Sequence, residues 1–193
     1  HIAGDGSSVK SLINKTWHGW KYVYERHVDD FDWFIKADDD TFLYMHNFRA
    51  YVAGLDPGAP PMPPPATIPD AHRQKFVAQQ ARFTRDARSG LGPRFLGRRF
   101  ANVDFSKPPT AKCYYPCFPT TDVHQFNAGG ASMALNAPAL RRLGCSMKSC
   151  EPGVRRYDVS RKKGNHEDIV MSRALQQVGI FPWDTRDAHG AER

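Results

Sequence analysis

Apolar residues recur with the period of a helix in four parts of the chain. Residues 8–27 place apolar side chains three or four positions apart on one face, which predicts an amphipathic helix. A shorter helix is predicted from about Tyr44 to Gly54, and another from Glu167 to Val178, with Asn165 as its cap. Residues 71–88 predict a polar helix on the surface, with few side chains to bury. These are Phe76, Val77 and Phe83.

Short apolar runs predict strands between these helices. One covers residues 33–37, one covers 94–100, and a glycine turn enters a third within 127–135. Asn136 is then expected to cap a short helix that runs through Leu143 and ends at Gly144. Because strands and helices alternate, we expect an α/β fold, with helices on the faces of a sheet.

A proline-rich stretch interrupts this pattern. Residues 57–69 contain seven prolines, so they cannot form a helix or a central strand. We interpret residues 57–93 as an inserted loop and polar helix that project from a single domain covering 1–193.

Composition limits the class of protein. At 193 residues, with 40% hydrophobic and 24% charged side chains, the chain is typical of one soluble globular domain. The net charge of +7 is scattered, and its densest stretch, 155–163, is better explained by a solvated loop than by a nucleic-acid surface. No apolar run approaches the roughly 20 residues that span a bilayer. The chain starts with His1, so we expect a segment of a longer protein, and a membrane anchor upstream stays open.

Four cysteines fall in two close pairs, Cys113/Cys117 and Cys145/Cys150. Neither pair has the C-x₂-C spacing of a zinc site, although a zinc site stays conceivable. Two local disulfides in an oxidising compartment are the favoured interpretation. A glycosylation sequon at Asn14 also favours a secretory lumen.

Three consecutive aspartates, Asp38 to Asp40, follow the strand that contains Trp33 and Phe34. Three adjacent carboxylates repel one another and resist burial unless a cation joins them. In an open α/β sheet, ligands bind beyond the carboxyl ends of the strands, where these acids are expected. The pattern therefore predicts a site for Mg²⁺ or Mn²⁺ that holds a diphosphate. The alternative is a solvated acidic turn before the helix at Tyr44.

Three further segments carry side chains suited to the same chemistry. Gly129 and Gly130 allow a backbone to pass close to a ligand, although such a sequence is also an ordinary turn. The guanidinium groups of Arg98 and Arg99 suit phosphate or carboxylate, or an exposed strand edge. Glu167 and Asp168 begin a helix, where carboxylates are favoured by the helix dipole whatever their function.

Taken together and in this order, these segments resemble the inverting β1,3-glycosyltransferases, and within them the core 1 β1,3-galactosyltransferase branch. The resemblance lies in five blocks: Asp32-Trp33-Phe34-Ile35-Lys36-Ala37-Asp38-Asp39-Asp40-Thr41, Leu96-Gly97-Arg98-Arg99-Phe100, Asn127-Ala128-Gly129-Gly130-Ala131, Glu167-Asp168 and Asp184-Thr185-Arg186-Asp187. It implies a GT-A type, Rossmann-like fold that binds nucleotide sugars, here as an incomplete fragment. It also implies Mn²⁺, with Mg²⁺ as the alternative, and a type II membrane protein on the luminal side of the Golgi.

The resemblance also assigns roles to individual residues. Asp38 and Asp40 would hold the metal, with Asp40 as the direct ligand, and Asp168 would be the catalytic base. The donor nucleotide sugar would contact the remaining candidates together with Asp38: Asp39, Arg98, Arg99, Gly129, Gly130 and Glu167.

The implied reaction moves galactose from UDP-galactose to the 3-hydroxyl of GalNAc on Ser or Thr of a glycoprotein. Such a single displacement needs one carboxylate base and a cation that neutralises the leaving diphosphate. Met133-Ala134-Leu135 replaces the family's aromatic residue after the glycines, and the family's N-terminal strands and C-terminal histidine ligand are missing. Transfer of GlcNAc or another hexose, a chaperone-like relative and a sugar-binding module therefore stay open, as does homodimerisation. No nucleic-acid partner is expected.

Overall fold

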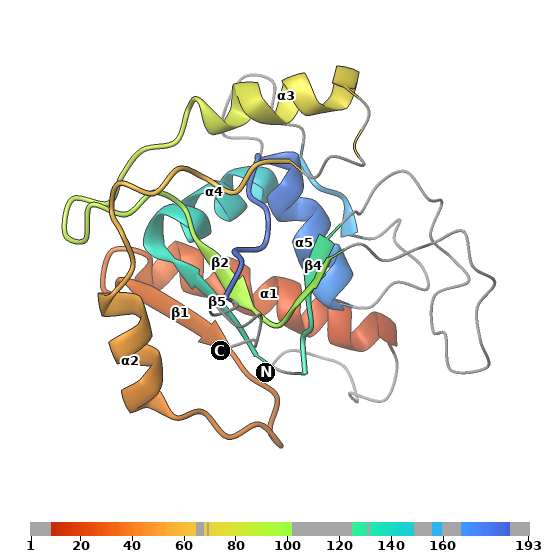
Figure 1. The fold of residues 1–193 in the computed structure, drawn as a ribbon. Helices are drawn as coiled ribbons and strands as arrows, with labels where there is room; N and C mark the ends of the chain where they lie inside the picture. The colour runs from red at the N-terminus through yellow and green to blue at the C-terminus, as the bar shows by residue number, and fades with distance from the viewer. Residues whose placement is uncertain are drawn as a thin grey trace.

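A computed structural model gives the fold of this protein. It describes residues 9–64, 68, 70–101, 125–130, 132–148, 156–159 and 167–185. In chain order the elements are α1 (Val9–His27), β1 (Trp33–Lys36), α2 (Met45–Ala53), α3 (Asp70–Gln80), β2 (Phe95–Gly97), β3 (Arg99–Ala101), β4 (Gln125–Asn127), β5 (Met133–Asn136), α4 (Ala137–Lys148) and α5 (Glu167–Gln177) (Figure 1).

The described strands form two small antiparallel sheets. One has the order β1-β5-β2, and the other pairs β3 with β4. In the first sheet Trp33 lies opposite Asn136, and Lys36 lies opposite Met133. The fold thus mixes helices with a small antiparallel sheet, which is compatible with an α/β fold. Asp38 to Asp40, the acidic tip that follows β1, therefore lie beside the start of β5. They do not lie beside the ends of parallel strands, where ligands bind in open parallel sheets.

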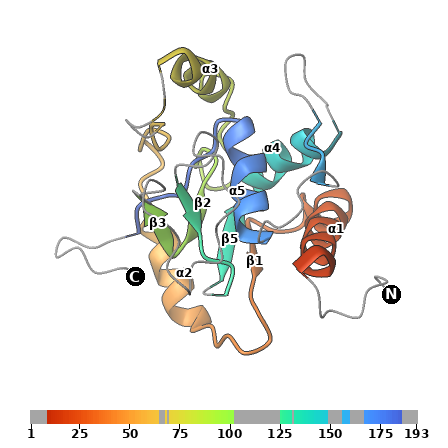
Figure 2. The ribbon, with the colours of Figure 1, turned by 90° about the vertical axis from the view of Figure 1, so that its right-hand side faces the viewer.

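Helices cover both faces of the three-stranded sheet. On one face, α1, α4 and α5 enclose the main core, whereas α2 lies on the other (Figure 1 and Figure 2). Phe34 belongs to the main core, while Trp33 meets Phe48 of α2 with ring centroids 5.7 Å apart. Successive strand side chains point to opposite faces. Lys36 therefore points to the same face as Phe34, towards α5.

The helical periodicity predicted the core helices well. The expected helix over 8–27 is α1, the helix from about Tyr44 is α2, and the helix from Glu167 is α5. The apolar face expected for this helix is buried. Its five side chains are each 1% exposed or less: Val170, Met171, Ala174, Leu175 and Val178. The expected cap Asn165 lies outside the described residues.

The expected end of α4 at Gly144 is wrong. The helix continues to Lys148 and passes straight through this glycine. A side chain at Gly144 would collide with the ring of Tyr24, so the glycine serves the close approach of α1 to α4 and does not terminate the helix.

The surface helix expected over 71–88 is shorter, because α3 ends at Gln80. The expectation that Val77 is buried is wrong, since this side chain is half exposed. Gln79 is buried in its place and accepts a hydrogen bond from Arg142 Nη2 at 3.0 Å. α3 packs on the segment after α5, where Phe76 and Phe181 meet edge to face with centroids 5.4 Å apart.

The strand expected over 94–100 is divided into β2 and β3, which belong to different sheets. Gly97 separates them with a φ of 152°, a backbone conformation that favours glycine. A Cβ there would lie only 3.0 Å from the Asn127 Cβ and from the Ser132 carbonyl oxygen. The chain therefore changes sheets at the only residue type that fits.

Asn136 caps α4, as the sequence predicts, and also ties down the start of β2. Its Oδ1 accepts hydrogen bonds from the Ala139 amide at 3.1 Å and from the Arg94 amide at 2.8 Å. Its Nδ2 donates to the Gly92 carbonyl at 2.8 Å.

Replacing Asn136 by Ala should lower the free energy of unfolding by roughly 2 to 4 kcal/mol, because a helix cap and two further bonds of a buried group are lost. Urea unfolding measures this change. Asn47→Ala, at an exposed position of α2, is the matched control and should shift stability by no more than about 0.5 kcal/mol. Equal stabilities for the two variants would contradict this role of Asn136.

Two further expectations concern cysteines and membranes. Cys145 is buried in the main core and is disulfide-bonded, but Cys113, Cys117 and Cys150 lie outside the described residues, so the pairing stays a prediction. Within the part of the chain that the structure describes, no helix has the length and apolar character needed to cross a membrane.

Candidate functional site

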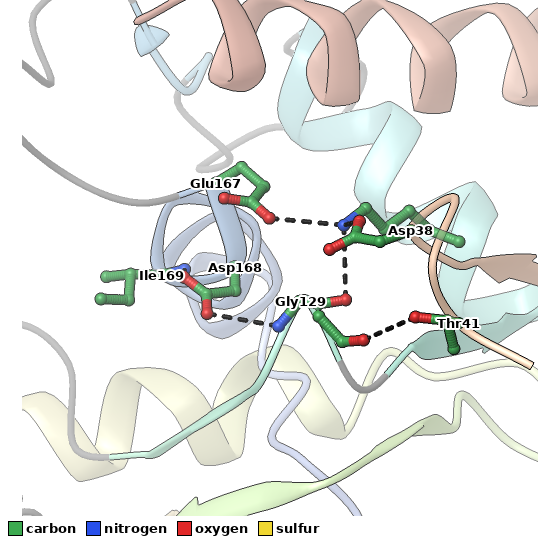
Figure 3. Close-up of polar contacts among 8 residues, drawn as sticks. Asp38, Thr41, Gly129, Glu167, Asp168 and Ile169 are labelled. Carbon is green, nitrogen blue, oxygen red and sulfur yellow. Dashed lines mark hydrogen bonds and ion pairs between the residues drawn. The ribbon is translucent and has the colours of Figure 1, made fainter. Parts of the chain in front are cut away.

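The antiparallel pairing of β1 with β5 brings two distant loops together. Because Lys36 lies opposite Met133, the residues after β1 run beside the residues before β5. Thr41 Oγ1 donates a hydrogen bond to the Gly130 carbonyl at 2.8 Å (Figure 3). The Thr41 amide donates to the Asp38 carbonyl at 3.1 Å. The acidic tip and the glycine pair are therefore adjacent parts of one site.

The first turn of α5 forms the third wall of this site. Asp168 Oδ2 accepts a hydrogen bond from the Gly129 amide at 3.3 Å, and its Oδ1 accepts one from the Ile169 amide at 2.7 Å (Figure 3). These two bonds from backbone amides fix the orientation of the Asp168 carboxylate. Glu167, the preceding residue, is buried and also points towards Gly129.

Lys36 contacts all three parts of the site: the acidic tip, the glycine turn and the start of α5. No role was predicted for this lysine from the sequence. Its ammonium group forms an ion pair with Asp38, donates to the Gly129 carbonyl at 3.3 Å and lies 3.3 Å from Glu167 Oε1. A lysine two positions after a phenylalanine in a predicted strand was the available signal. That spacing places the lysine on the core face, where an ammonium group needs acidic or carbonyl partners.

Glycine is required at position 129 by the close approach of α5. A Cβ there would lie 2.5 Å from Glu167 Oε1 and 3.3 Å from the Asp168 Cβ. At Gly130 the nearest atom to a Cβ would be Asp38 Oδ2, at an ordinary 3.6 Å. Gly129 is thus the tight position of the pair, and Gly130 is the exposed one.

The acidic tip offers oxygen ligands of the kind that Mn²⁺ and Mg²⁺ prefer. Asp38 shares one carboxylate oxygen with Lys36, and Asp39 and Asp40 are exposed. No cluster of three or more His, Cys, Asp or Glu side chains suited to a metal occurs among the described residues. These donors fit an ion that is completed by substrate phosphates and water, and they do not form a cage made by the protein alone.

The two neighbouring arginines predicted for the site lie in different surroundings. Arg99 forms an ion pair with Asp184 at 2.5 Å, and the arginine side chain is 8% exposed. Arg98 is exposed and lines a cavity of about 190 Å³ between the sheet and α2, together with Leu43 and Ser132. Of the predicted site residues, the structure thus brings Asp38, Gly129, Gly130, Glu167 and Asp168 together, while Arg99 pairs with the segment after α5.

Comparison with known proteins shows a short partial similarity to a galactosyltransferase. No family model matches the chain. Over 46 residues, 24% of this chain, it is 37% identical to "Glycoprotein-N-acetylgalactosamine 3-beta-galactosyltransferase 1" of Xenopus laevis. The matched segment spans 13% of the length of that relative. This partial similarity supports a glycosyltransferase-like function and suggests a β1,3-galactosyltransferase family at most.

Proposed function

We propose that this chain carries the catalytic centre of an inverting, metal-dependent glycosyltransferase of the GT-A type. The donor would be UDP-galactose, and the acceptor would be the 3-hydroxyl of GalNAc on Ser or Thr of a glycoprotein. The observation that carries the proposal is the meeting of Asp168 with the Gly129–Gly130 turn, directly beside the acidic tip at Asp38. The name of the Xenopus laevis relative supports the choice of sugar and acceptor.

In this proposal Asp168 is the general base. It lies in the first turn of a helix, where two backbone amides orient its carboxylate, and a positioned carboxylate can take a proton as a general base. In the proposed reaction the acceptor 3-hydroxyl gives its proton to Asp168 as its oxygen bonds to the anomeric carbon of the donor. The bond from that carbon to the UDP oxygen breaks, and UDP leaves with the electron pair, so one displacement inverts the configuration.

Asp38 and Asp40 are the residues that would hold a divalent cation in this proposal. When bound, Mn²⁺ or Mg²⁺ would neutralise charge on the leaving diphosphate. The chain's own contribution is to keep the acidic tip fixed, and it does so through the bonds of Thr41 to the Gly130 and Asp38 backbone. A luminal Golgi location with a membrane anchor in the longer protein belongs to the same proposal.

The direct test supplies the full-length protein with UDP-galactose, Mn²⁺ and a GalNAc-peptide. We expect a β1,3-linked disaccharide, identified by linkage-specific digestion. Product from a different UDP-sugar alone would move the protein to another β1,3 branch. Binding of the sugar nucleotide without any transfer would favour a sugar-binding module, and binding of neither UDP nor Mn²⁺ would overturn the proposal.

Replacing Asp40 by Ala should lower kcat/KM by about 100-fold or more, because a ligand of the charge-neutralising cation is lost. The variant should also bind Mn²⁺ more weakly in calorimetry, a readout that does not depend on turnover. Asp30→Ala removes an exposed aspartate whose carboxylate pairs with His27, and it should change kcat/KM by less than about twofold. Unchanged Mn²⁺ binding in Asp40→Ala would remove this residue from the metal site.

A further inference from the structure

Lys36 is the residue through which the two carboxylate-bearing segments of the site meet. Its ammonium group contacts Asp38 on the acidic tip, the Gly129 carbonyl on the glycine turn, and Glu167 on α5. The Lys36 and Glu167 side chains are 17% and 8% exposed, respectively. The ion pair between Lys36 and Glu167 is therefore shielded from water and is stronger than an ordinary surface ion pair.

The position of this ammonium group is fixed by the sheet. Lys36 is the last residue of β1, paired with Met133 of the central strand, and it shares the core face with Phe34. A lysine on a loop could follow the carboxylates wherever they moved. A lysine at the end of a paired strand instead holds them at one place.

Removing the positive charge would take away the ammonium group that both Asp38 and Glu167 contact. Glu167 would then be a buried carboxylate with no counter-charge from Lys36, which is strongly unfavourable. The two segments would have to separate to let water in. Asp168 is the next residue after Glu167, so it would move with the start of α5.

A second path joins Lys36 to Asp168. The Gly129 residue accepts from Lys36 on its carbonyl oxygen, and its amide donates to Asp168 Oδ2. Gly129 thus accepts a hydrogen bond from the Lys36 ammonium group and donates one to the Asp168 carboxylate. Both paths end on Asp168.

We propose that Lys36 is a positioning residue that holds Asp168 against the Gly129–Gly130 turn. Its kinetic consequence rests on the proposed function, because Asp168 acts as a base only if the protein transfers a sugar. The structural consequence, a displacement of Asp168 when Lys36 is replaced, does not depend on the proposed function. A base displaced by about 1 Å can lose about 100-fold in rate, so Lys36 should affect kcat while never touching the substrate.

The test uses four variants of the full-length protein: Lys36→Met, Glu167→Gln, the double variant, and Lys21→Met as an exposed control on α1. In urea unfolding, Lys36→Met should lower the ratio of folded to unfolded protein by at least about 100-fold. Adding Glu167→Gln removes the unpaired charge and should restore at least about tenfold of that loss. Lys21→Met should match the wild type in stability and in kcat.

The kinetic readout separates positioning from mere stabilisation. The double variant should keep a kcat about 100-fold below that of Glu167→Gln alone, with the KM for UDP-galactose within about threefold, although its stability has recovered. A purely structural lysine predicts that kcat recovers together with stability, and that result would overturn the proposal.

Amide hydrogen exchange tests the same inference without any turnover. The Gly129 amide, held by Asp168, should exchange at least about tenfold faster in the double variant than in Glu167→Gln, while the amides of β5 keep their protection. Unchanged exchange at Gly129 would overturn the role of Lys36. Failure of the wild type to transfer any sugar would instead overturn the proposed function and leave this exchange result to decide on Lys36.

Discussion

Replacing Asp168 by Asn is expected to lower kcat by about 1,000-fold, within the range that a positioned general base contributes. The amide cannot accept the proton of the acceptor hydroxyl. It also cannot accept hydrogen bonds from both the Gly129 and the Ile169 amides, because one of its two ends is itself a donor. The lost bond should reduce stability by only about 1 to 2 kcal/mol, so the folded variant can be assayed. Single-turnover transfer to a GalNAc-peptide at saturating UDP-galactose measures the loss.

Asp70→Asn is the matched control for this variant. Asp70 also lies in the first turn of a helix, α3, so its replacement removes the same favourable charge at a helix N-terminus. It should lower stability by less than about 1 kcal/mol and leave kcat unchanged. If Asp168→Asn behaved in the same way as Asp70→Asn, Asp168 would be a capping residue and not a base.

Replacing Gly129 by Ala is expected to have the second-largest effect, on both stability and turnover. The new methyl group would lie 2.5 Å from Glu167 Oε1, so this buried carboxylate must leave its place beside Lys36. Separating a buried ion pair in this way should lower the free energy of unfolding by about 3 kcal/mol. The shift of the α5 start should lower kcat by about 100-fold. Urea unfolding and transfer assays measure the two effects.

Two other glycines provide the contrast. Gly19→Ala lies within α1, and a Cβ there would meet no described atom within 4 Å. This change should stabilise the protein by up to about 1 kcal/mol, because alanine favours the helix. Gly130→Ala would make only an ordinary contact with Asp38 and should fold as the wild type does. Normal stability and turnover of Gly129→Ala would contradict the described packing of α5 on the glycine turn.

The helices were predictable because their patterns are local. In an amphipathic helix such as α1, apolar side chains face the core and polar ones face the solvent, so the spacing within one helix is enough to recognise it. Asn136 was recognised as a cap for a similar reason, since its side chain bonds to an amide three residues away. The acidic run after β1 could also be recognised from the sequence, because adjacent carboxylates repel one another in any fold.

Residues whose roles depend on a distant neighbour were predicted incorrectly or missed. Gly144 has the sequence signature of a helix end, but it serves the approach of α4 to Tyr24, more than a hundred residues earlier. Val77 was expected inside and Gln79 outside, and the partner Arg142 reverses that order. The ion pair of Arg99 with Asp184 after α5 was not anticipated, while its predicted contact with the donor stays a prediction.

Periodicity and the chemistry of neighbouring residues were enough to predict the core helices, the strand before the acidic tip, and the list of candidate carboxylates and glycines. Which of these candidates meet depends on how distant segments pack. The antiparallel register of Lys36 with Met133 turns the acidic tip towards the glycine pair, and the packing of α5 adds Asp168 to them. Register and helix packing depend on contacts between segments about 40 to 130 residues apart, which no local pattern encodes.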